Sequence, residues 1–158
     1  MTQYVLCYAV PDTIDWDDVL LIEKLKPEWQ RGKLNLPGGK IEENESIHEA
    51  ASRELREETG IYCGLNDITL LGRIYGEWGD CYVCHCVYRD NQHWEQKEAE
   101  KLVNLNYSDA IRDERLIDNL RLIIPWCLCE LNGWSLYQGP MHYPNQWEIK
   151  HDAETEVS

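Results

Sequence analysis

The sequence predicts one mixed α/β domain in which a β-sheet lies between helices. Three observations lead to this fold class. The chain has 158 residues, the usual size of one domain, and can bury a core without disulfides. Runs rich in β-branched and aromatic residues lie on both sides of one amphipathic helix, and a second helical segment follows them. Strands, a helix, further strands and a closing helix are typical of a sandwich.

The first third of the chain predicts strands and a long loop. Residues 3–10 and 18–25 are apolar and β-rich, and the acidic segment PDTIDWDD between them predicts a turn, so a hairpin or sheet is expected to begin the fold. The segment KPEWQRGKLNLPGGK contains several prolines and glycines, which predict a loop around a short strand at residues 33–36. Loops of this length tend to carry function.

Residues 46–59 have the clearest helical pattern. Apolar residues recur every four positions, at Ile47, Ala51 and Leu55. Ser46 followed three residues later by Glu49 predicts a capping box, although Asn44 is a rival N-cap. Gly60 is well placed to end the helix in a left-handed conformation.

The second half of the chain predicts more strands and a closing helix. The strands are expected at residues 68–75, 82–88 and 101–106, with a polar loop before the last one. Residues 108–131 are expected to be helical with an interruption near Pro125, because proline lacks the amide that a helix needs.

An aromatic C-terminal extension is expected to follow the domain. We expect the domain over residues 1–131 and the extension over residues 132–158. The extension is rich in Trp and Tyr up to Trp147, so part of it should pack on the domain, whereas its polar end HDAETEVS should be disordered.

The charge of the chain limits its partners. A net charge of −14 argues against a nucleic acid polymer, since phosphate contacts need clustered Lys and Arg. A small anionic substrate would need a local cation, and a divalent metal held by carboxylates is the usual source. No run approaches the roughly 18 apolar residues of a membrane span, and no secretory signal is visible. We therefore expect a cytoplasmic protein that does not bind membranes.

The cysteines are expected to be reduced thiols, because their number, seven, is odd and no secretory signal precedes them. The segment CYVCHC raises the alternative of a zinc site with Cys81, Cys84, His85 and Cys86 as ligands. On a strand, however, alternate residues point to opposite faces, and a second CxxC pair is missing. Zinc is therefore the weaker interpretation.

Glu54, Glu57 and Glu58 form an acidic cluster on the predicted helix. They are three and four residues apart, so they can project to one side while the apolar face anchors the helix. Carboxylates at these spacings repel one another, so a cation is expected to offset them. Hard oxygen ligands suit Mg²⁺ or Mn²⁺. The alternative is a solvated helix face neutralised by Arg53 and Arg56.

The spacing around this cluster resembles the Nudix box of the Nudix hydrolases. Gly39 is followed after five residues by Glu45, and seven further residues lead to RELREETGI at 53–61, which matches every defined position of the box. The resemblance implies a Nudix fold, an α/β/α sandwich with a mixed β-sheet. It also implies metal-dependent hydrolysis of a nucleoside diphosphate linked to another group. Outside the box, a weaker likeness extends over roughly residues 3–131.

The resemblance also implies site residues. The metal ligands would be Glu54, Glu57 and Glu58, braced by Arg53. Gly39 would present its main chain to the site, and Glu45 resembles the box glutamate that supports the loop.

Many relatives recruit another acid from outside the box, and the candidates here are Glu98 and Glu100, with Glu95 behind them. The general base could be Glu54, Glu57 or the outside glutamate.

Substrate specificity must come from residues outside the box. The stretch WQRGKLNLPGGK, with Trp29, Lys33 and Asn35, resembles the corresponding loop of MutT-like members that cleave nucleoside triphosphates. The later DNLRLIIPW resembles their entry into the final helix, which implies Asp118 and Asn119 as base-reading residues. Trp29 and Trp78 could stack on a base. The alternatives are that Asn119 caps a helix and that the tryptophans belong to the core.

The predicted activity is therefore Mg²⁺-dependent hydrolysis of a nucleoside triphosphate, a deoxynucleoside triphosphate or its oxidised form, to the monophosphate and pyrophosphate. ADP-ribose or a dinucleoside polyphosphate is the second substrate class. A nucleotide-binding module without turnover is disfavoured, because all box glutamates are present. The aromatic extension could cover a partner surface, which would make the protein a homodimer.

Overall fold

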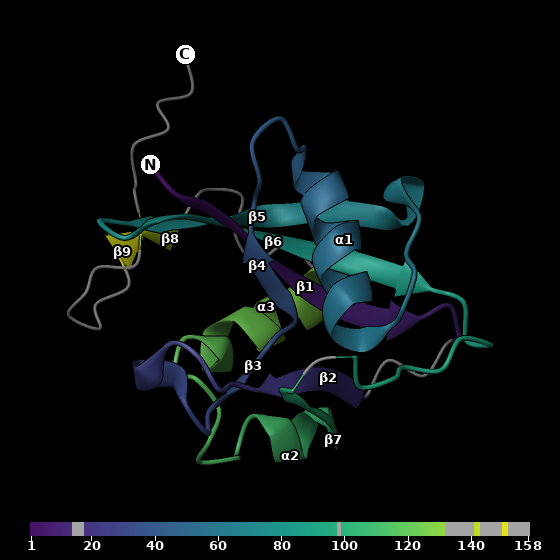
Figure 1. The fold of residues 1–158 in the computed structure, drawn as a ribbon. Helices are drawn as coiled ribbons and strands as arrows, with labels where there is room; N and C mark the ends of the chain where they lie inside the picture. Colours follow the sequence, from purple (N-terminus) through teal and green to yellow (C-terminus); the bar gives the residue numbers. More distant parts are fainter. Residues whose placement is uncertain (14–17, 98, 132–140, 143–149, 152–158) are drawn as a thin grey trace.

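A computed structural model describes residues 1–13, 18–97, 99–131, 141–142 and 150–151 (Figure 1). Its larger sheet has the strand order β4-β1-β6-β5-β8-β9. These strands are β1 (Gln3–Pro11), β4 (Gly38–Lys40), β5 (Ile68–Gly76), β6 (Gly79–Tyr88), β8 (Met141–His142) and β9 (Lys150–His151). The central pair β1 and β6 is parallel, whereas β4 is antiparallel to β1 and β5 to β6, so the sheet is mixed as predicted.

A smaller sheet has the order β3-β2-β7, made by β2 (Asp18–Glu23), β3 (Leu34–Asn35) and β7 (Lys101–Asn106). The hairpin considered for residues 3–10 and 18–25 is wrong, because β1 and β2 belong to different sheets. Strand β1 already uses its two edges for β4 and β6, and β2 pairs with β3 and β7 instead. Strand β4 was expected to be part of a loop, because its two glycines are typical of loops. The structure instead pairs it with β1.

Three α-helices and two short 3₁₀ segments complete the described part of the chain. They are α1 (Ile47–Thr59), α2 (Tyr107–Ala110), α3 (Leu120–Leu131) and the 3₁₀ turns Glu28–Gln30 and Leu65–Asp67. The predicted break at Pro125 is wrong, because Pro125 lies inside α3. The helical segment breaks earlier, since Leu34 of β3 accepts from the Ile117 amide and donates to the Arg115 carbonyl. Residues 115–117 therefore run beside a strand.

Two apolar cores place α1 and α3 on opposite faces of the larger sheet (Figure 1). One core joins α1 to β1 and β6 through Ala51, Leu55, Cys7, Cys84 and Cys86. The other joins α3 to the opposite face and to the smaller sheet through Leu120, Ile123, Ile124, Tyr8, Val83 and Leu21. The predicted α/β/α sandwich is confirmed.

The C-terminal extension is described only at β8 and β9, and β8 adds to the larger sheet by pairing with β5. Its tryptophans, which were expected to pack on the domain, lie outside the described residues. Of the end HDAETEVS, which was expected to be disordered, His151 lies in β9 and residues 152–158 lie outside the described residues. Across the described parts of the chain, no helix is both long enough and apolar enough to cross a membrane.

Candidate active site

Helix α1 is held at both ends by the residues that its sequence predicted. The Glu49 amide donates to Ser46 Oγ (3.2 Å), and the Ser46 amide donates to Glu49 Oε2 (2.8 Å), which completes the capping box. Gly60 ends the helix with φ +75°, a conformation that suits glycine. Asn44, the rival cap, instead has φ +65° in the preceding loop. Both ends being fixed, the acidic face keeps one orientation.

Arg53 connects the acidic residues of the box. Its guanidinium donates to both oxygens of Glu45 (2.7 and 2.8 Å), to Glu54 Oε1 (2.8 Å) and to Glu57 Oε2 (3.3 Å). It also donates to the Lys40 carbonyl (3.0 Å). The hydrogen bond to Glu45 is the main cause of the raised pKa of Arg53, and in return it lowers the pKa of Glu45. Arg53 thus ties α1 to the loop before it.

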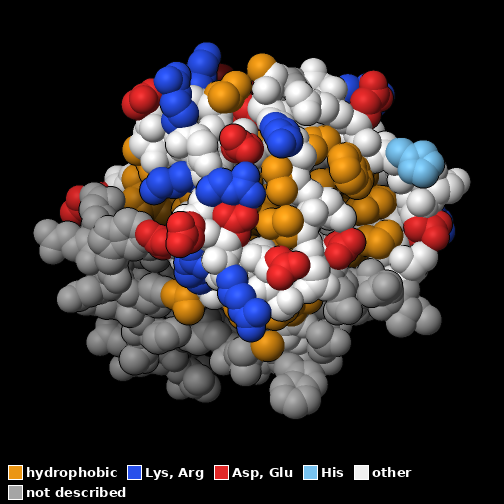
Figure 2. Space-filling model, turned by 90° about the horizontal axis from the view of Figure 1, so that it is seen from below, with side chains coloured by type: hydrophobic (Ala, Val, Ile, Leu, Met, Phe, Trp, Pro, Cys, Tyr) orange, Lys and Arg blue, Asp and Glu red, His pale blue; other side chains and the backbone are white. Residues whose placement is uncertain are grey.

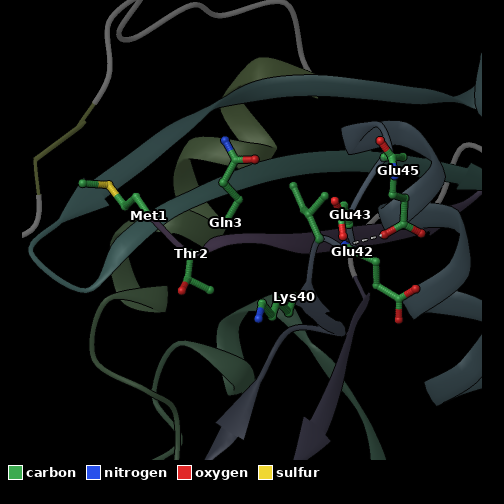
Figure 3. A pocket seen from close by; sticks show the side chains of 9 residues that line it. Met1, Thr2, Gln3, Lys40, Glu42, Glu43 and Glu45 are labelled. Atoms are coloured by element: carbon green, nitrogen blue, oxygen red, sulfur yellow. Dashed lines mark hydrogen bonds between the residues drawn. The ribbon is translucent and has the colours of Figure 1, made fainter.

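Figure 3 shows this loop, which runs from β4 to α1. The Glu42 amide donates to Glu45 Oε2 (3.0 Å). Glu45 therefore holds the loop in place in addition to binding Arg53. A hollow of about 480 Å³ lies between this loop and the N-terminal residues 1–3. A second groove, about 670 Å³, follows the outer face of α1 past Arg53 and Glu57.

Gly39 and Glu54 are in immediate proximity. A Cβ on Gly39 would lie 2.4 Å from Glu54 Oε1, so only glycine allows the carboxylate to reach the main chain of β4. Burial is the largest influence on Glu54, and it raises the pKa of this carboxyl although Arg53 opposes it. Glu57, one turn further along α1, has a side chain that is 52% exposed and that pairs with Arg53 at 3.3 Å.

Glu58 is the buried carboxylate of the cluster. Its Oε2 accepts from the Gly38 amide (2.7 Å), and its Oε1 lies 3.6 Å from Lys24 Nζ. Burial raises the pKa of Glu58 to about 7, against the opposing effects of Lys24 and the Gly38 amide. A further positive charge beside Glu58 would therefore stabilise its ionised form.

Glu100 joins the same site from outside the box. Its Oε2 lies 2.6 Å from Lys24 Nζ, and its Oε1 accepts from the amides of Leu25 (2.8 Å) and Lys26 (3.4 Å). Burial works to raise its pKa, but the bonds from Lys24 and these amides outweigh burial and lower it. Lys24 thus places Glu100 beside Glu58.

The other two outside candidates are Glu95 and Glu98. Glu98 lies outside the described residues. Glu95 is exposed, pairs with Lys97 (2.9 Å) and follows the end of α1, where its amide donates to the Thr59 carbonyl. Of the two candidates that the structure describes, Glu100 is the one that lies beside a box carboxylate.

The donor set consists of carboxylate and main-chain oxygens around Gly39, which fits Mg²⁺ or Mn²⁺ in chemistry. Within the described part of the chain, no three His, Cys, Asp or Glu side chains are arranged to hold a metal as they stand. Each box carboxylate is turned to a cation of the chain, Arg53 or Lys24. The zinc alternative fails on geometry, because Cys81 and Cys84 belong to cores on opposite faces of β6.

Two of the predicted substrate segments are neighbours in space. Strand β3, which holds Asn35, is hydrogen-bonded to residues 115–117, just before Asp118 and Asn119. The side chain of Asn35 bonds to residues nearby in the chain, accepting from the Leu36 amide (2.9 Å) and donating to Gln30 Oε1 (3.2 Å). Asn119 Oδ1 is buried without a hydrogen-bond partner among the described residues. Such an atom is a candidate acceptor for a ligand.

The remaining substrate candidates lie at the surface. Trp29 is 64% exposed in the first 3₁₀ turn, and Lys33 is half-buried in the loop that follows. Asp118 is exposed and lies 3.8 Å from Arg121. Trp78 lies at the β5–β6 turn against the ring of Tyr4, with centroids 6.2 Å apart, and is 38% exposed. Neither tryptophan belongs to the core.

The face seen from below carries mixed charges. Figure 2 shows Lys and Arg side chains interspersed with Asp and Glu, and the described side chains in this view form no continuous basic surface.

Sequence reasoning missed Lys24 and the Gly38 amide. Lys24 follows four buried strand residues, 19–22, and the only available signal was a lysine at the end of an apolar run. Its role depends on Glu100, 76 positions away in the chain, so local pattern could not reveal it.

Known proteins resemble this chain in parts of its length. A family model, the NUDIX domain, matches residues 5–127. The 8-oxo-dGDP phosphatase NUDT18 of Homo sapiens is 43% identical over 60 residues, 37% of this chain and 18% of that protein. An ADP-ribose pyrophosphatase of Methanocaldococcus jannaschii is 42% identical over 53 residues, 34% of this chain and 31% of that protein. These matches thus span less than a third of either relative.

Solved structures share the fold. A MutT protein from Bacillus halodurans superimposes with a TM-score of 0.63 at 22% identity, over 96% of this chain and 95% of that one. A NUDIX hydrolase from Nitrosomonas europaea gives 0.68 at 17% identity, over 90% and 78%. The family model covers more than half of the chain and includes the whole box, so the chain belongs to the Nudix family.

Proposed function

We propose that the chain hydrolyses a phosphoanhydride bond in a nucleoside diphosphate derivative, with Mg²⁺ or Mn²⁺ as cofactor. The observation that carries this proposal is the arrangement of three carboxylates: Glu54 reaches the main chain of Gly39, Glu58 accepts from the Gly38 amide, and Lys24 joins Glu58 to Glu100. Surface acidic clusters are usually solvated, whereas Glu58 is only 7% exposed. Burying a carboxylate beside other carboxylates costs free energy. Such arrangements therefore cluster at functional sites.

Glu54, Glu57 and Glu58 would hold the metal, with the main chain of Gly39 and the carboxylate of Glu100. The glycine at position 39 supports this set, because its missing side chain leaves the main chain open to Glu54. When bound, a divalent cation would neutralise phosphate oxygens and acidify water. Arg53 would keep Glu54 and Glu57 in place, and through Glu45 it would hold the loop.

Hydrolysis forms one P–O bond from water and breaks the bridging P–O bond, so a base must take the proton that water loses. Among the candidates we assign this role to Glu54. Burial raises the pKa of Glu54, which makes it a stronger base, whereas Lys24 and two amides lower the pKa of Glu100. Glu57 is the second candidate, since its carboxylate is exposed to solvent.

The proposed substrate is a nucleoside triphosphate, deoxy or oxidised, cleaved to the monophosphate and pyrophosphate. NUDT18, which shares 43% identity over 60 residues, is named an 8-oxo-dGDP phosphatase, and this supports oxidised nucleotides. Asn119 could read the base with its buried, unpartnered oxygen, and Asp118, Asn35 and Lys33 lie in the adjoining segments. Trp29 and Trp78 would offer exposed stacking surfaces.

ADP-ribose is the second candidate, because the relative from Methanocaldococcus jannaschii is named an ADP-ribose pyrophosphatase. A dinucleoside polyphosphate belongs to the same class. Products separate the two readings, since a triphosphate yields pyrophosphate and one monophosphate, whereas ADP-ribose yields two monophosphates.

The test is a panel of nucleotides incubated with the full chain and Mg²⁺. The panel contains dGTP, 8-oxo-dGTP, 8-oxo-dGDP, ADP-ribose and a dinucleoside tetraphosphate, with products separated by chromatography. Glu57→Gln should lower kcat by roughly a hundredfold or more, as expected for loss of a charged group in the site. Glu43→Gln is the matched control, because Glu43 is exposed in the loop before α1. Turnover of no substrate, or equal loss in both variants, would overturn the proposal.

We also propose a division into a hydrolase domain, residues 1–131, and an extension, residues 132–158, that could mediate dimer formation. Light scattering on the full chain and on residues 1–131 measures this directly. A cytoplasmic location is supported by the cysteines, all of which are free thiols.

A further inference from the structure

Lys24 is a partly buried cation shared by two carboxylates from different parts of the fold. Its Nζ lies 2.6 Å from Glu100 Oε2 and 3.6 Å from Glu58 Oε1. The side chains of Lys24, Glu58 and Glu100 are 16%, 8% and 13% exposed, so water screens these charges weakly. They come from the end of β2, from α1 and from the segment before β7.

The second oxygen of each carboxylate is held by the main chain. Glu58 Oε2 accepts from the Gly38 amide, and Glu100 Oε1 accepts from the Leu25 amide and more weakly from the Lys26 amide. Neither carboxylate can turn away without losing these bonds. Each therefore presents one oxygen to the same ammonium group, and the position of that group depends on both.

We propose that Lys24 is a positioning residue that occupies the free oxygens of Glu58 and Glu100 and thereby weakens the affinity of this site for a divalent cation. The inference rests on the proposed function, in which Glu58 and Glu100 are metal ligands. A cation of the chain and a metal ion need the same negative charge, so each reduces the attraction available to the other. Binding of the metal would require the ammonium to move off at least one carboxylate.

A purely structural role for Lys24 predicts the opposite effect. If Lys24 only kept Glu100 beside Glu58, its removal would release a ligand and weaken metal binding. In the competition role, the amides of residues 25 and 38 still hold the two carboxylates after Lys24 is removed. The metal would then bind more tightly, because no ammonium has to be displaced.

Isothermal titration of the full chain with Mg²⁺ alone separates these roles. The titration is done at about pH 9, where Glu58, whose pKa burial raises to about 7, is ionised. Lys24→Met should lower the Kd for Mg²⁺ by roughly tenfold. Lys24→Arg keeps a positive charge at this position and should have the Kd of the wild type. Lys97→Met is the matched control, because Lys97 is 46% exposed and pairs with the exposed Glu95. It should leave the Kd unchanged.

Unchanged or weaker binding by Lys24→Met would overturn the inference. If that variant fails to unfold cooperatively in urea, Lys24→Gln takes its place with the same expectation. The titration needs no turnover, so its outcome is separate from the proposed function. If the chain hydrolyses none of the nucleotides but Lys24→Met binds Mg²⁺ more tightly, only the proposed function is overturned. If the chain hydrolyses nucleotides but Lys24→Met leaves the Kd unchanged, only the inference about Lys24 is overturned.

Discussion

Gly39→Ala is expected to lower activity strongly while leaving the fold intact. An ideal Cβ at this position would lie 2.4 Å from Oε1, 2.5 Å from Cδ and 2.6 Å from Oε2 of Glu54. Ordinary van der Waals contact begins at 3.4 Å, so the carboxylate must retreat by about 1 Å. A misplacement of this size at a reacting centre can cost roughly a hundredfold in rate. We therefore expect kcat to fall by about that factor.

The fold should tolerate the same substitution. The contact is with the end of a flexible side chain, and Gly39 has no left-handed φ that would strain alanine. Alanine also restricts the unfolded chain, which stabilises proteins by about 0.4–1 kcal/mol where the backbone allows it. The two effects oppose each other, so we expect the free energy of unfolding to change by less than about 1 kcal/mol.

The assay combines steady-state kinetics on the best nucleotide of the panel with urea unfolding. Gly64→Ala is the matched control, because Gly64 has φ −66° and its Cβ would meet only the Asp67 carboxylate, at 3.2 Å. Activity of Gly39→Ala within threefold of wild type, together with inactive Glu54→Gln, would refute the reasoning. In that case Glu54 would act without needing the close approach to β4.

Three further substitutions test the fold around the site. Ser46→Ala removes the capping box of α1 and should lower the free energy of unfolding by about 1 kcal/mol in urea; no loss would mean that Glu49 alone caps the helix. Leu55→Ala should cost about 2–5 kcal/mol, because Leu55 is 0% exposed between α1 and the sheet, and a loss below 1 kcal/mol would show that the core collapses around the gap. Burial lowers the pKa of His85 from 6.5 to about 4, so as pH falls the imidazole is protonated in the unfolded chain before it is protonated in the folded chain. Wild type should therefore lose unfolding free energy from pH 6.5 towards 4, and His85→Met should lose less; equal pH slopes of urea unfolding would contradict this.

Local signals predicted the elements whose stability is local. Helix α1 was predicted almost to the residue, because the apolar spacing, the Ser46–Glu49 box and Gly60 all act within one helix. Strands β1, β5 and β7 were likewise visible as β-rich runs. The break before α3 was misplaced, because residues 115–117 leave the helix to pair with Leu34, a contact across more than 80 positions.

The candidate site divides in the same way. The acidic cluster of Glu54, Glu57 and Glu58 could be named from the sequence, since the helical repeat alone sets these residues on neighbouring faces. Their proposed role as metal ligands comes from the resemblance to the Nudix box. The choice of Glu100 as partner of Glu58 could not, because it depends on Lys24 at the end of another strand.

By itself, the sequence determined the acidic helix, most of the strands and the family, because helix periodicity, caps and the box spacing are properties of neighbouring residues. Only the tertiary structure decided which strands pair, that Glu100 shares Lys24 with Glu58, and how each carboxylate is held. These outcomes depend on burial and on contacts between distant segments. Burial makes Glu58 hold its proton more tightly than an exposed glutamate does, and a distant lysine makes Glu100 hold its own less tightly.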